Sequence, residues 1–457
     1  MKRALTLVLT LLATICAVGA LRLSHVDMEN VRTIDVFGNF SLQIPPGLHY
    51  AALSMGLLVM GGFLAGELAA SIALPRVTAY LLFGIVVGPS LASWLPKGFP
   101  TLVPQAELNY LEFVQALAVS LIGLIAGSEL KIPFLRTAGS RICKMLAFES
   151  VGVALCVGVL LLVVAWFGAV PFLAERTPTE RWFLVAVLTA LISASSPAVV
   201  VAILRETKAS GAFAQTSLAM VVLKDLVLVI VISAMLAVWT SGQSQDTAWK
   251  ATFGVSWHLA GSLLIGLIFA LVLGVIAKRT RFRLDMVMVI AGFAIALSGK
   301  LLNVAPLIVG ITAGFALTNL SPNTSRRLFS SIDNILPTTY VIFFATTGAK
   351  ISLDSLMIIW PLAVGACAVR FVGCWSGLRI GCRVAGASDL ERKWLWTVMV
   401  SQAGVSIALA SEIQRVFAQQ EWAVQLQSFM LATIVINEVI GPPLMRLGVI
   451  RSGEART

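Results

Sequence analysis

The chain has 457 residues, of which 58% are hydrophobic and only 12% charged, and its mean hydropathy is +0.93. Soluble globular domains carry a charged fraction of about 25%, roughly twice as much. Apolar runs of about 18 residues or more recur along the chain, and each is long enough to cross a hydrocarbon layer about 30 Å thick. The composition therefore excludes a water-soluble fold and predicts an all-α integral membrane protein that spans the bilayer many times.

The formal net charge of +11 is distributed in a way that argues against nucleic-acid binding. Basic residues gather in alternate short loops, for example in 131–144 and in 278–283. This alternation is typical of the positive-inside rule, which orients helices in a membrane. The cysteines and histidines show no metal-type spacing, and no nucleophile has a base close to it in the sequence. We therefore expect neither a nucleic-acid partner nor an enzyme.

The first segment, residues 1–23, has the layout of a secretory signal. Lys2 and Arg3 precede a long apolar run that ends in small residues near Ala20. This pattern is typical of a signal peptide, and an uncleaved signal anchor fits it equally well. In either case the polar stretch 24–46 is expected to lie outside the cell.

About thirteen membrane spans are expected after this segment, in a transmembrane domain at 48–447, followed by a short cytoplasmic tail at 448–457. Threading the spans alternately places most Lys and Arg side chains on one side, so the tail is expected in the cytoplasm. The expected spans are 50–74, 77–95, 108–130, 145–170, 182–204, 213–240, 255–277, 286–302, 304–320, 328–349, 356–379, 394–410 and 426–444.

Small residues four apart mark two places where helices can approach closely. Gly84 and Gly88 form one such pair, and Gly310 and Gly314 form the other. This spacing favours backbone-to-backbone helix packing in membranes. We interpret both pairs as packing sites.

Ionisable groups inside membrane spans are energetically expensive, so each is a candidate functional residue. Lys224 and Asp225 lie in the middle of the span 213–240, and Arg370 lies deep within 356–379. Glu149 and Glu438 are two further acids within apolar spans, and we expect each to pair with a basic group or a helix end. Arg370 is expected to bind a carboxylate or helix carbonyl groups, and a structural ion pair is an alternative for Lys224 and Asp225.

Two of the expected spans are interrupted. Pro197, preceded by Ser195 and Ser196, breaks the span 182–204, because proline removes a helical hydrogen bond and clashes with the preceding turn. The polar and flexible run 401–404, which includes Gln402, falls within the span 394–410. Interrupted spans in both halves of a chain indicate an ion site in an inverted-repeat transporter.

Four stretches together resemble the cation/proton antiporter superfamily, in the branch of Kef-type and sodium/proton exchangers. The resemblance covers the chain from about His49 to Arg446. The stretches are LPRVTAYLLFG at 74–84 with GPS at 88–90, LIAGSEL at 124–130, SSPAVVV at 195–201 and NEVIGP at 437–442.

The resemblance implies an inverted-repeat fold whose two interrupted helices cross at the ion site, and a homodimer in which a core domain moves against a dimer scaffold. Asp225 matches the position of the family's ion-carrying aspartate, and Arg370 that of a buried basic residue. The crossing is matched by Ser195, Ser196 and Gln402. Glu149 and Glu438 are expected to compensate charge, as Arg370 does.

Lys224 departs from the family pattern, which usually has Asp, Asn or Gln before the carrying aspartate. If Lys224, Arg370 and Asp225 are all charged, the site is net positive, and a further cation is costly to admit. Because burial disfavours the charged ammonium, we expect Lys224 to release its proton when the cation enters. A dead site or an anion-handling site is the rival interpretation.

The sequence thus predicts a secondary transporter in a bacterial inner membrane that exchanges a monovalent cation, Na⁺ or K⁺, for protons. Asp225 would be the shared carrier: it binds the cation when deprotonated and releases it when protonated. Two alternatives stay open, a membrane regulator or sensor that kept the fold and lost transport, and an organic-anion symporter of related fold.

Overall fold

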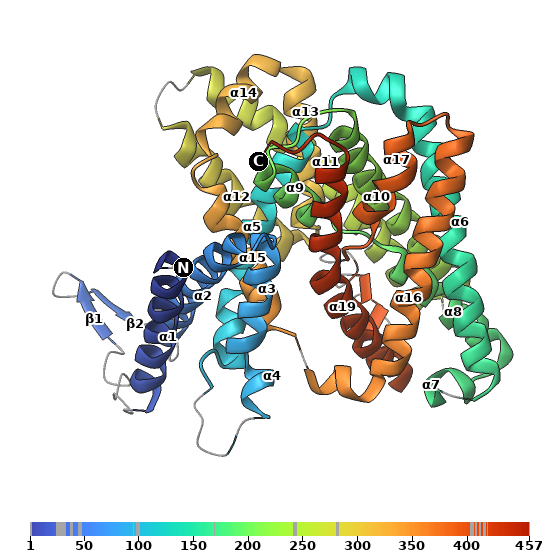
Figure 1. The fold of residues 1–457 in the computed structure, drawn as a ribbon, viewed down its shortest axis with the longest axis horizontal. Helices are drawn as coiled ribbons and strands as arrows, with labels where there is room; N and C mark the ends of the chain where they lie inside the picture. Colours follow the sequence, from blue (N-terminus) through green and yellow to red (C-terminus); the bar gives the residue numbers. More distant parts are fainter. Residues whose placement is uncertain are drawn as a thin grey trace. The chain divides into compact units, whose positions relative to one another are not determined.

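The structure is a computed structural model of the whole chain. It describes residues 2–23, 33–36, 40–43, 48–94, 96, 101–168, 170–240, 245–279, 283–351, 353–402, 406, 409–410, 413–414, 417 and 419–456. Almost every secondary-structure element in these ranges is a helix (Figure 1). The all-helical membrane fold expected from the composition is therefore confirmed.

Within the described ranges, nine helices are long and apolar enough to cross a membrane, and ten if α14 and α15 are counted as one span. Three shorter apolar helices, Thr6–Val18, Arg76–Val87 and Pro306–Leu320, add to these. The expected number of about thirteen spans stays a prediction, because length and composition alone do not assign the shorter helices.

The contacts divide the chain into two compact units. The first consists of residues 1–118 and 334–353. Its elements are α1 (Lys2–Leu23), β1 (Thr33–Val36), β2 (Phe40–Gln43), α2 (Leu48–Ser71), α3 (Arg76–Val87), α4 (Pro89–Ala92), the first part of α5 (Gln105–Ser128) and α15 (Leu336–Ala349). The two strands form an antiparallel hairpin in which Thr33 pairs with Gln43 and Val36 with Phe40.

The second unit consists of residues 119–333 and 354–457. Besides the end of α5, its elements are α6 (Ile132–Trp166), α7 (Pro171–Ala174), α8 (Pro178–Ser193), α9 (Pro197–Glu206), α10 (Ala212–Thr240), α11 (Gln245–Arg279), α12 (Leu284–Leu302), α13 (Pro306–Leu320), α14 (Pro322–Ser331), α16 (Leu353–Val384), α17 (Asp389–Trp394), the 3₁₀ helix η2 (Leu395–Met399) and α19 (Glu421–Arg451).

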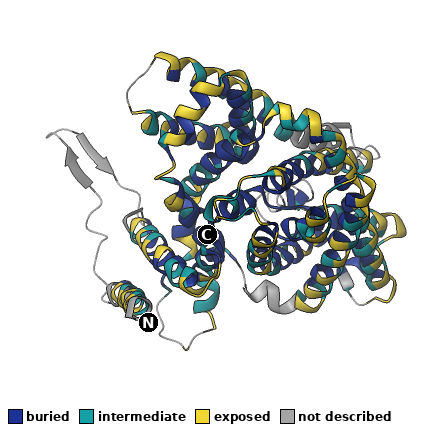
Figure 2. Ribbon diagram, turned by 45° about the horizontal axis from the view of Figure 1, so that its top comes forward, coloured by how far each residue is buried: buried dark blue, intermediate teal, exposed yellow. Residues whose placement is uncertain are grey.

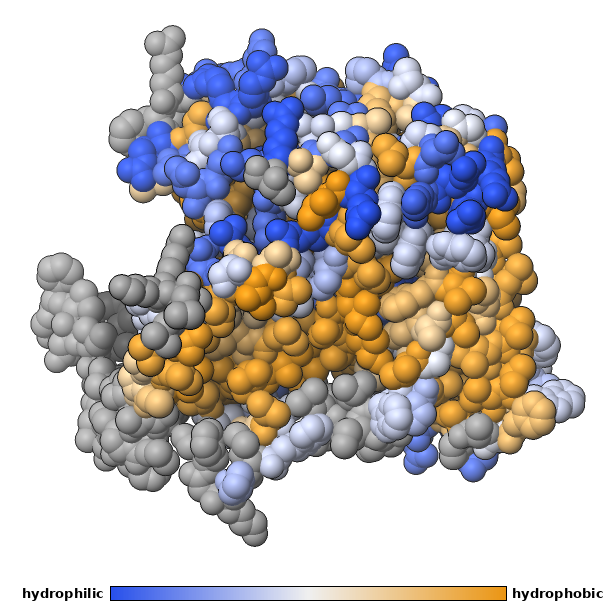
Figure 3. Space-filling view, in the orientation of Figure 1, coloured by the Kyte–Doolittle hydropathy of each residue, from blue (hydrophilic) through white to orange (hydrophobic). Residues whose placement is uncertain are grey.

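The pair α8–α9 is the most buried of the helices long enough to cross a membrane. In its most apolar stretch 89% of the residues are buried, against 22% for α6. Exposed residues lie on the outer faces of the helices and buried ones on the faces that meet (Figure 2). The surface over α6 and α16 is largely apolar, with hydrophilic residues gathered toward the end where α17 lies (Figure 3). Apolar side chains on that surface, such as Leu155 and Val372, are therefore suited to contact lipid.

Glycines bring several helices into backbone contact. A Cβ on Gly84 would meet the backbone of Ala345 in α15, and a Cβ on Gly314 would meet the backbone of Leu124 in α5. In the same way, a Cβ on Gly152 of α6 would lie 2.6 Å from the carbonyl oxygen of Gly373 in α16. The prediction that the glycine pairs are packing sites is therefore confirmed for Gly84 and Gly314.

The break in the span 182–204 lies where the sequence predicts it. Helix α8 ends at Ser193 and α9 begins at Pro197, which leaves Ala194, Ser195 and Ser196 outside both helices. Ser196 is the N-cap of α9, and its hydroxyl accepts a hydrogen bond from the backbone N–H of Val199. Proline suits the first position of a helix because the N–H that it lacks would have no partner there.

The second interrupted span begins as α17, continues as η2 and then leaves the helical conformation at Ser401 and Gln402. Ala403 and Gly404, which belong to the predicted interruption, lie outside the described residues. Helical conformation is present again at Ser406.

The expected span 328–349 is divided between two helices. Residues 328–331 belong to α14, and a new helix, α15, begins at Leu336 after a turn at 332–335. Asp333 and Asn334 favour a turn, and Pro337 occupies the first turn of α15, so the sequence does carry the signal for this break.

We expect Gly314→Ala to destabilise the protein by about 1–3 kcal/mol, because its Cβ has no room beside the backbone of α5. The matched control is Gly139→Ala in α6, where a Cβ meets nothing within 4 Å. Alanine favours a helix over glycine by up to about 1 kcal/mol, so the control should be neutral or slightly more stable. Melting temperatures of the purified proteins in detergent measure both effects, and equal values for the two variants would contradict the packing assignment.

Candidate functional site

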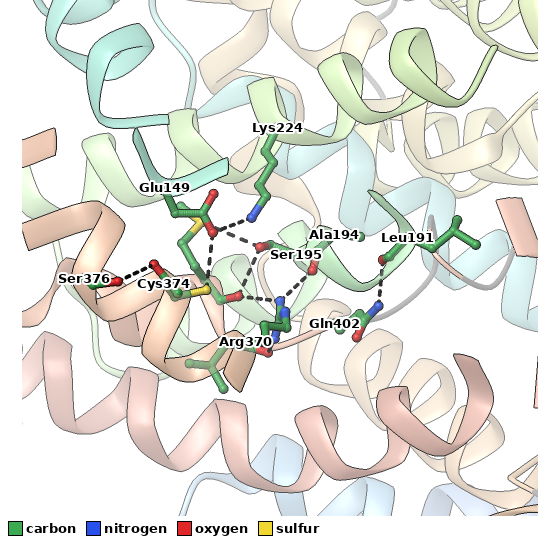
Figure 4. Close-up of polar contacts among 12 residues, drawn as sticks. Glu149, Leu191, Ala194, Ser195, Lys224, Arg370, Cys374, Ser376 and Gln402 are labelled. Atoms are coloured by element: carbon green, nitrogen blue, oxygen red, sulfur yellow. Dashed lines mark hydrogen bonds and ion pairs between the residues drawn. The ribbon is translucent and has the colours of Figure 1, made fainter. Parts of the chain in front are cut away.

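Arg370 of α16 is completely buried and binds three backbone carbonyl groups. Its Nη1 donates to the carbonyl oxygen of Val400 at 2.5 Å, and its Nη2 donates to those of Ala194 and Met399, both at 2.6 Å. Ala194 belongs to the first interruption, whereas Met399 and Val400 belong to the second (Figure 4). One guanidinium group therefore contacts both interrupted helices.

These three carbonyls are the groups that an interrupted helix leaves without partners. The last carbonyls of a helix have no intrahelical donor, and the helix dipole makes that end partly negative. Ala194 ends α8, and Met399 and Val400 end η2. A buried cation with several donors satisfies both ends at once. Of the two kinds of partner expected for Arg370, the structure has the helix carbonyls.

The two interruptions also bind each other directly. The backbone N–H of Ser196 donates to the carbonyl oxygen of Ser401 at 2.9 Å. The hydroxyl of Ser195 donates to the carbonyl oxygen of Met399 at 3.1 Å, the same oxygen that Arg370 contacts. The crossing expected from the two breaks is thus formed by backbone and side-chain hydrogen bonds between segments about 200 residues apart.

Gln402 connects the crossing to α19. Its Nε2 donates to the carbonyl oxygen of Leu191 in α8 at 2.9 Å, and its Oε1 accepts from Nδ2 of Asn437 at 2.8 Å. All three residues are buried. In the sequence, Asn437 stands out only as part of a stretch that resembles the family. A polar amide within an apolar span is also a candidate functional residue in its own right.

Lys224 forms a buried ion pair with Glu149. The Lys224 Nζ lies 2.6 Å from the Glu149 Oε1, and the same oxygen accepts from the Cys374 thiol at 3.3 Å. These residues come from three helices, α10, α6 and α16 (Figure 4). Glu149 therefore pairs with a basic group as expected, and Lys224 has the structural ion pair that was its alternative interpretation. Cys374 was not identified as part of the site from the sequence.

The ion pair makes the net charge of the site less positive than the sequence predicts, because it adds the carboxylate of Glu149. The expectation of a net positive site counted Lys224, Arg370 and Asp225 and left out Glu149. With Glu149 included, the ammonium of Lys224 is balanced by a carboxylate at 2.6 Å. The groups left to count are one positive group, Arg370, and two buried carboxyl groups, Asp225 and Glu438.

Asp225 differs from Lys224, Glu149 and Arg370, whose side chains all form hydrogen bonds. The residue is only 3% exposed, and neither carboxylate oxygen has a hydrogen-bond partner among the described residues. The structure therefore forms no hydrogen bond between Asp225 and Ser195, Ser196 or Gln402. A buried carboxylate without partners requires a proton or a cation.

Glu438 of α19 is also buried, and neither of its carboxylate oxygens has a hydrogen-bond partner in the described part of the chain. The expected pairing of Glu438 with a basic group or a helix end is therefore not met there. Its neighbour Asn437 does have a partner, because its Nδ2 donates to the Oε1 of Gln402.

A cavity of about 380 Å³ lies between α6, α8 and α10. Its wall is mostly apolar and includes Lys224, together with the small polar residues Ser150 and Ser193. The ion pair of Lys224 therefore borders open space on one side.

We expect Glu149→Gln to destabilise the protein by about 3–5 kcal/mol, because it leaves the Lys224 ammonium buried without a counter-ion. The double variant Glu149→Gln with Lys224→Gln removes both charges and should recover most of that loss. Thermal unfolding in detergent, followed by tryptophan fluorescence, measures the recovery. A double variant no more stable than Glu149→Gln would show that the two residues do not act as a pair.

Comparisons with known proteins place the chain in a family. The family described as sodium/hydrogen exchanger, transmembrane, matches residues 55–447. No curated protein sequence matches the chain.

Two structures of the sodium proton antiporter MjNhaP1 from Methanocaldococcus jannaschii have a similar fold. The structure at pH 8 is 16% identical, covers 88% of this chain and 98% of its own, and has a TM-score of 0.60. The structure from an electron-microscopy map is 15% identical, covers 90% of this chain and 99% of its own, and has a TM-score of 0.62. At this identity the likeness establishes the fold, while the family match extends over most of the sequence. The chain therefore belongs to the sodium/hydrogen exchanger family, whose members are multi-pass membrane transporters that exchange cations and protons.

Proposed function

We propose that this protein is a secondary active transporter that exchanges a monovalent cation, Na⁺ or K⁺, for protons by alternating access. The observation that carries the proposal is the carboxylate of Asp225, which is buried within α10 and has no hydrogen-bond partner among the described residues. Membership of the sodium/hydrogen exchanger family supports the same reaction. Asp225 is the carrier in this proposal.

Cation and proton compete for the same carboxylate. Na⁺ and K⁺ are hard cations that prefer oxygen ligands, and an ionised carboxylate supplies both ligands and charge. A protonated carboxyl group has lost the charge that attracts the cation. Because the carrier holds either the cation or the proton, movement of the site between the two membrane faces exchanges one for the other.

Ser195 and Ser196 are suited to complete the oxygen ligands. The Ser195 hydroxyl donates its proton to the Met399 carbonyl, which leaves its lone pairs free. The Ser196 hydroxyl accepts one bond from the backbone of Val199, which leaves its second lone pair free. The Met399 carbonyl already accepts from both Ser195 and Arg370, which uses both of its lone pairs. The serine hydroxyls are therefore better placed than this carbonyl to act as ligands, with Gln402 as a positioning group.

The charges of the site favour exchange of one cation for one proton. Lys224 and Glu149 neutralise each other, so the charge of Asp225 is not offset by the neighbouring lysine. Binding of either a monovalent cation or a proton to Asp225 raises the charge of the site by one unit. The two loaded states are then electrostatically equivalent, and no other group has to titrate. In this proposal the ion pair of Lys224 and Glu149 takes no part in the exchange, in place of the expected role of Lys224 in releasing a proton.

The contact of Lys224 speaks against one of the two alternative functions. A regulator or sensor in which the Lys224 ammonium takes the cation's place at Asp225 would require its Nζ to bind Asp225, but that atom contacts Glu149. An organic-anion symporter stays an alternative, because the Nε of Arg370 has no hydrogen-bond partner among the described residues.

The proposal includes the organisation of the whole protein. Residues 48–447 form the exchanger domain, 1–23 are a signal peptide or signal anchor, and 448–457 lie on the cytoplasmic side of a bacterial inner membrane. We further propose a homodimer, on the strength of the family resemblance alone.

The test is cation-induced collapse of a pre-formed proton gradient in everted membrane vesicles, with Na⁺, K⁺ and Li⁺ added separately. Wild-type protein should collapse the gradient with at least one cation, and Asp225→Asn should abolish the response, because an amide cannot exchange a proton for a cation.

Asp389→Asn makes the same chemical change on a carboxylate whose side chain is 85% exposed, and it should leave the response intact. Exchange that persists in Asp225→Asn would contradict the assignment of the carrier. No response to any cation in wild-type vesicles, across a range of pH, would contradict the function.

A further inference from the structure

The segment that follows α19 folds back onto the connection between α9 and α10. The carboxylate of Glu454 accepts two backbone hydrogen bonds at the start of α10, from the N–H of Phe213 at 2.8 Å and from that of Ala214 at 2.9 Å. The backbone N–H of Arg456 donates to the carbonyl oxygen of Thr207 at 2.9 Å. Thr207 is the C-cap of α9. The segment thus binds both ends of the short connection 208–211.

The sequence of α10 explains why a carboxylate binds there. The first N–H groups of a helix have no intrahelical acceptors, and the helix dipole favours negative charge at that end. The first turn of α10 contains no acidic residue of its own. Glu454 supplies the missing charge from a distant part of the chain. A bidentate carboxylate on two backbone N–H groups is among the stronger kinds of hydrogen bond.

Gly211 provides the space for this contact. A Cβ at this position would meet the carboxyl carbon and both carboxylate oxygens of Glu454. The φ of Gly211 is not in the left-handed region, so backbone conformation does not require glycine here. The requirement comes from the close approach of Glu454.

The connection 208–211, next to the Glu454 carboxylate, also forms part of the wall of a cavity. This cavity has a volume of about 360 Å³, and it runs between α9 and α10 from Lys208 and Gly211 to Leu218. Leu218 lies about two helical turns before Asp225 on the same helix. The cavity therefore borders the first two turns of the helix that bears the carrier, and its lining includes Gly211 and Ala214, which the Glu454 carboxylate contacts.

We propose that Glu454 is a positioning residue for transport: its carboxylate fixes the start of α10 and thereby the shape of the cavity through which a cation approaches the Asp225 helix. The inference rests on the proposed exchange function. When the carboxylate is lost, the two N–H groups of α10 lose their acceptor and the first turn opens more often. A cation that approaches from this side then enters less readily, although saturating cation still fills the site.

The experiment compares Glu454→Gln, Glu454→Asp and Gly211→Ala with wild-type protein. Glu454→Gln removes the charge and keeps the shape, Glu454→Asp keeps the charge, and Gly211→Ala displaces the intact carboxylate. Glu421→Gln is the matched control, because Glu421 is an exposed acid in the first turn of the same α19 helix.

The first readout is amide hydrogen exchange of the purified protein, which does not depend on transport. In Glu454→Gln and Gly211→Ala we expect the amides of Phe213 and Ala214 to exchange roughly three- to thirtyfold faster, the factor that corresponds to loss of a helix cap. Glu454→Asp and Glu421→Gln should stay close to wild type.

The second readout is the cation dependence of exchange in proteoliposomes, with the cation presented on the side where α10 begins. Glu454→Gln and Gly211→Ala should raise the apparent KM by about threefold or more, with a maximal rate per folded protein within about twofold of wild type. Glu454→Asp should restore the wild-type KM.

An active wild type with unchanged KM in Glu454→Gln would overturn the positioning role and leave the proposed function standing. A lower melting temperature without a change in KM would equally overturn it and reduce Glu454 to a structural contact. If wild-type protein shows no cation/proton exchange at all, the proposed function fails and the positioning role fails with it, and faster amide exchange would then show only a helix cap.

Discussion

Two interrupted helices leave carbonyl groups in the interior of a membrane-spanning bundle, where water is not available to satisfy them. Arg370 donates to three of these carbonyls, one from the end of α8 and two from the end of η2. Unsatisfied backbone groups cost several kcal/mol each in such surroundings, of order 2–7 kcal/mol by transfer measurements. The two breaks can therefore exist side by side only because a buried cation with several donors lies between them. The Ser195, Ser196 and Gln402 contacts depend on the crossing that this arrangement stabilises.

A second consequence concerns charge. Arg370 places a full positive charge at the crossing, where it binds carbonyl groups. Lys224 adds a second positive charge, next to Asp225 in α10. Its contact with Glu149 at 2.6 Å holds that charge in a neutral pair formed by side chains of α10 and α6. The proposed exchange of one cation for one proton at Asp225 follows from this separation of a fixed pair and a free carboxylate.

Two kinds of feature could be predicted from the sequence: those set by a local residue pattern, and charges that cost free energy to bury in a membrane span. Pro197 marks the first break because proline cannot continue a helix, and Arg370, Lys224 and Asp225 stand out because charge inside a span is rare. The sequence also predicted that Glu149 pairs with a basic group or a helix end. It did not identify which one, because Lys224 lies 75 residues further along the chain and only the packing of α6 against α10 brings the two together.

Other features depend on tertiary contacts that leave little trace in the sequence. The hydrogen bonds from Gln402 to Leu191 and Asn437 join three helices, and a carbonyl acceptor such as that of Leu191 has no sequence signal at all. Nothing in the sequence distinguishes Cys374 from other small apolar residues of a span, and only the fold shows that its thiol donates to Glu149. The break between α14 and α15 was different, because Asp333, Asn334 and Pro337 carried the signal and the apolar run around them concealed it.

The central claim is that one carboxylate, that of Asp225, holds either the cation or the proton. Calorimetric titration of the purified protein with the transported cation tests this most directly, with each titration repeated in two buffers of different ionisation enthalpy to count the protons released. At a pH where the empty site is protonated, the account predicts one proton released for each cation bound. It also predicts an apparent affinity that falls about tenfold for each unit decrease in pH, and no binding in Asp225→Asn. Binding that releases no proton, or that persists in Asp225→Asn, would contradict the account.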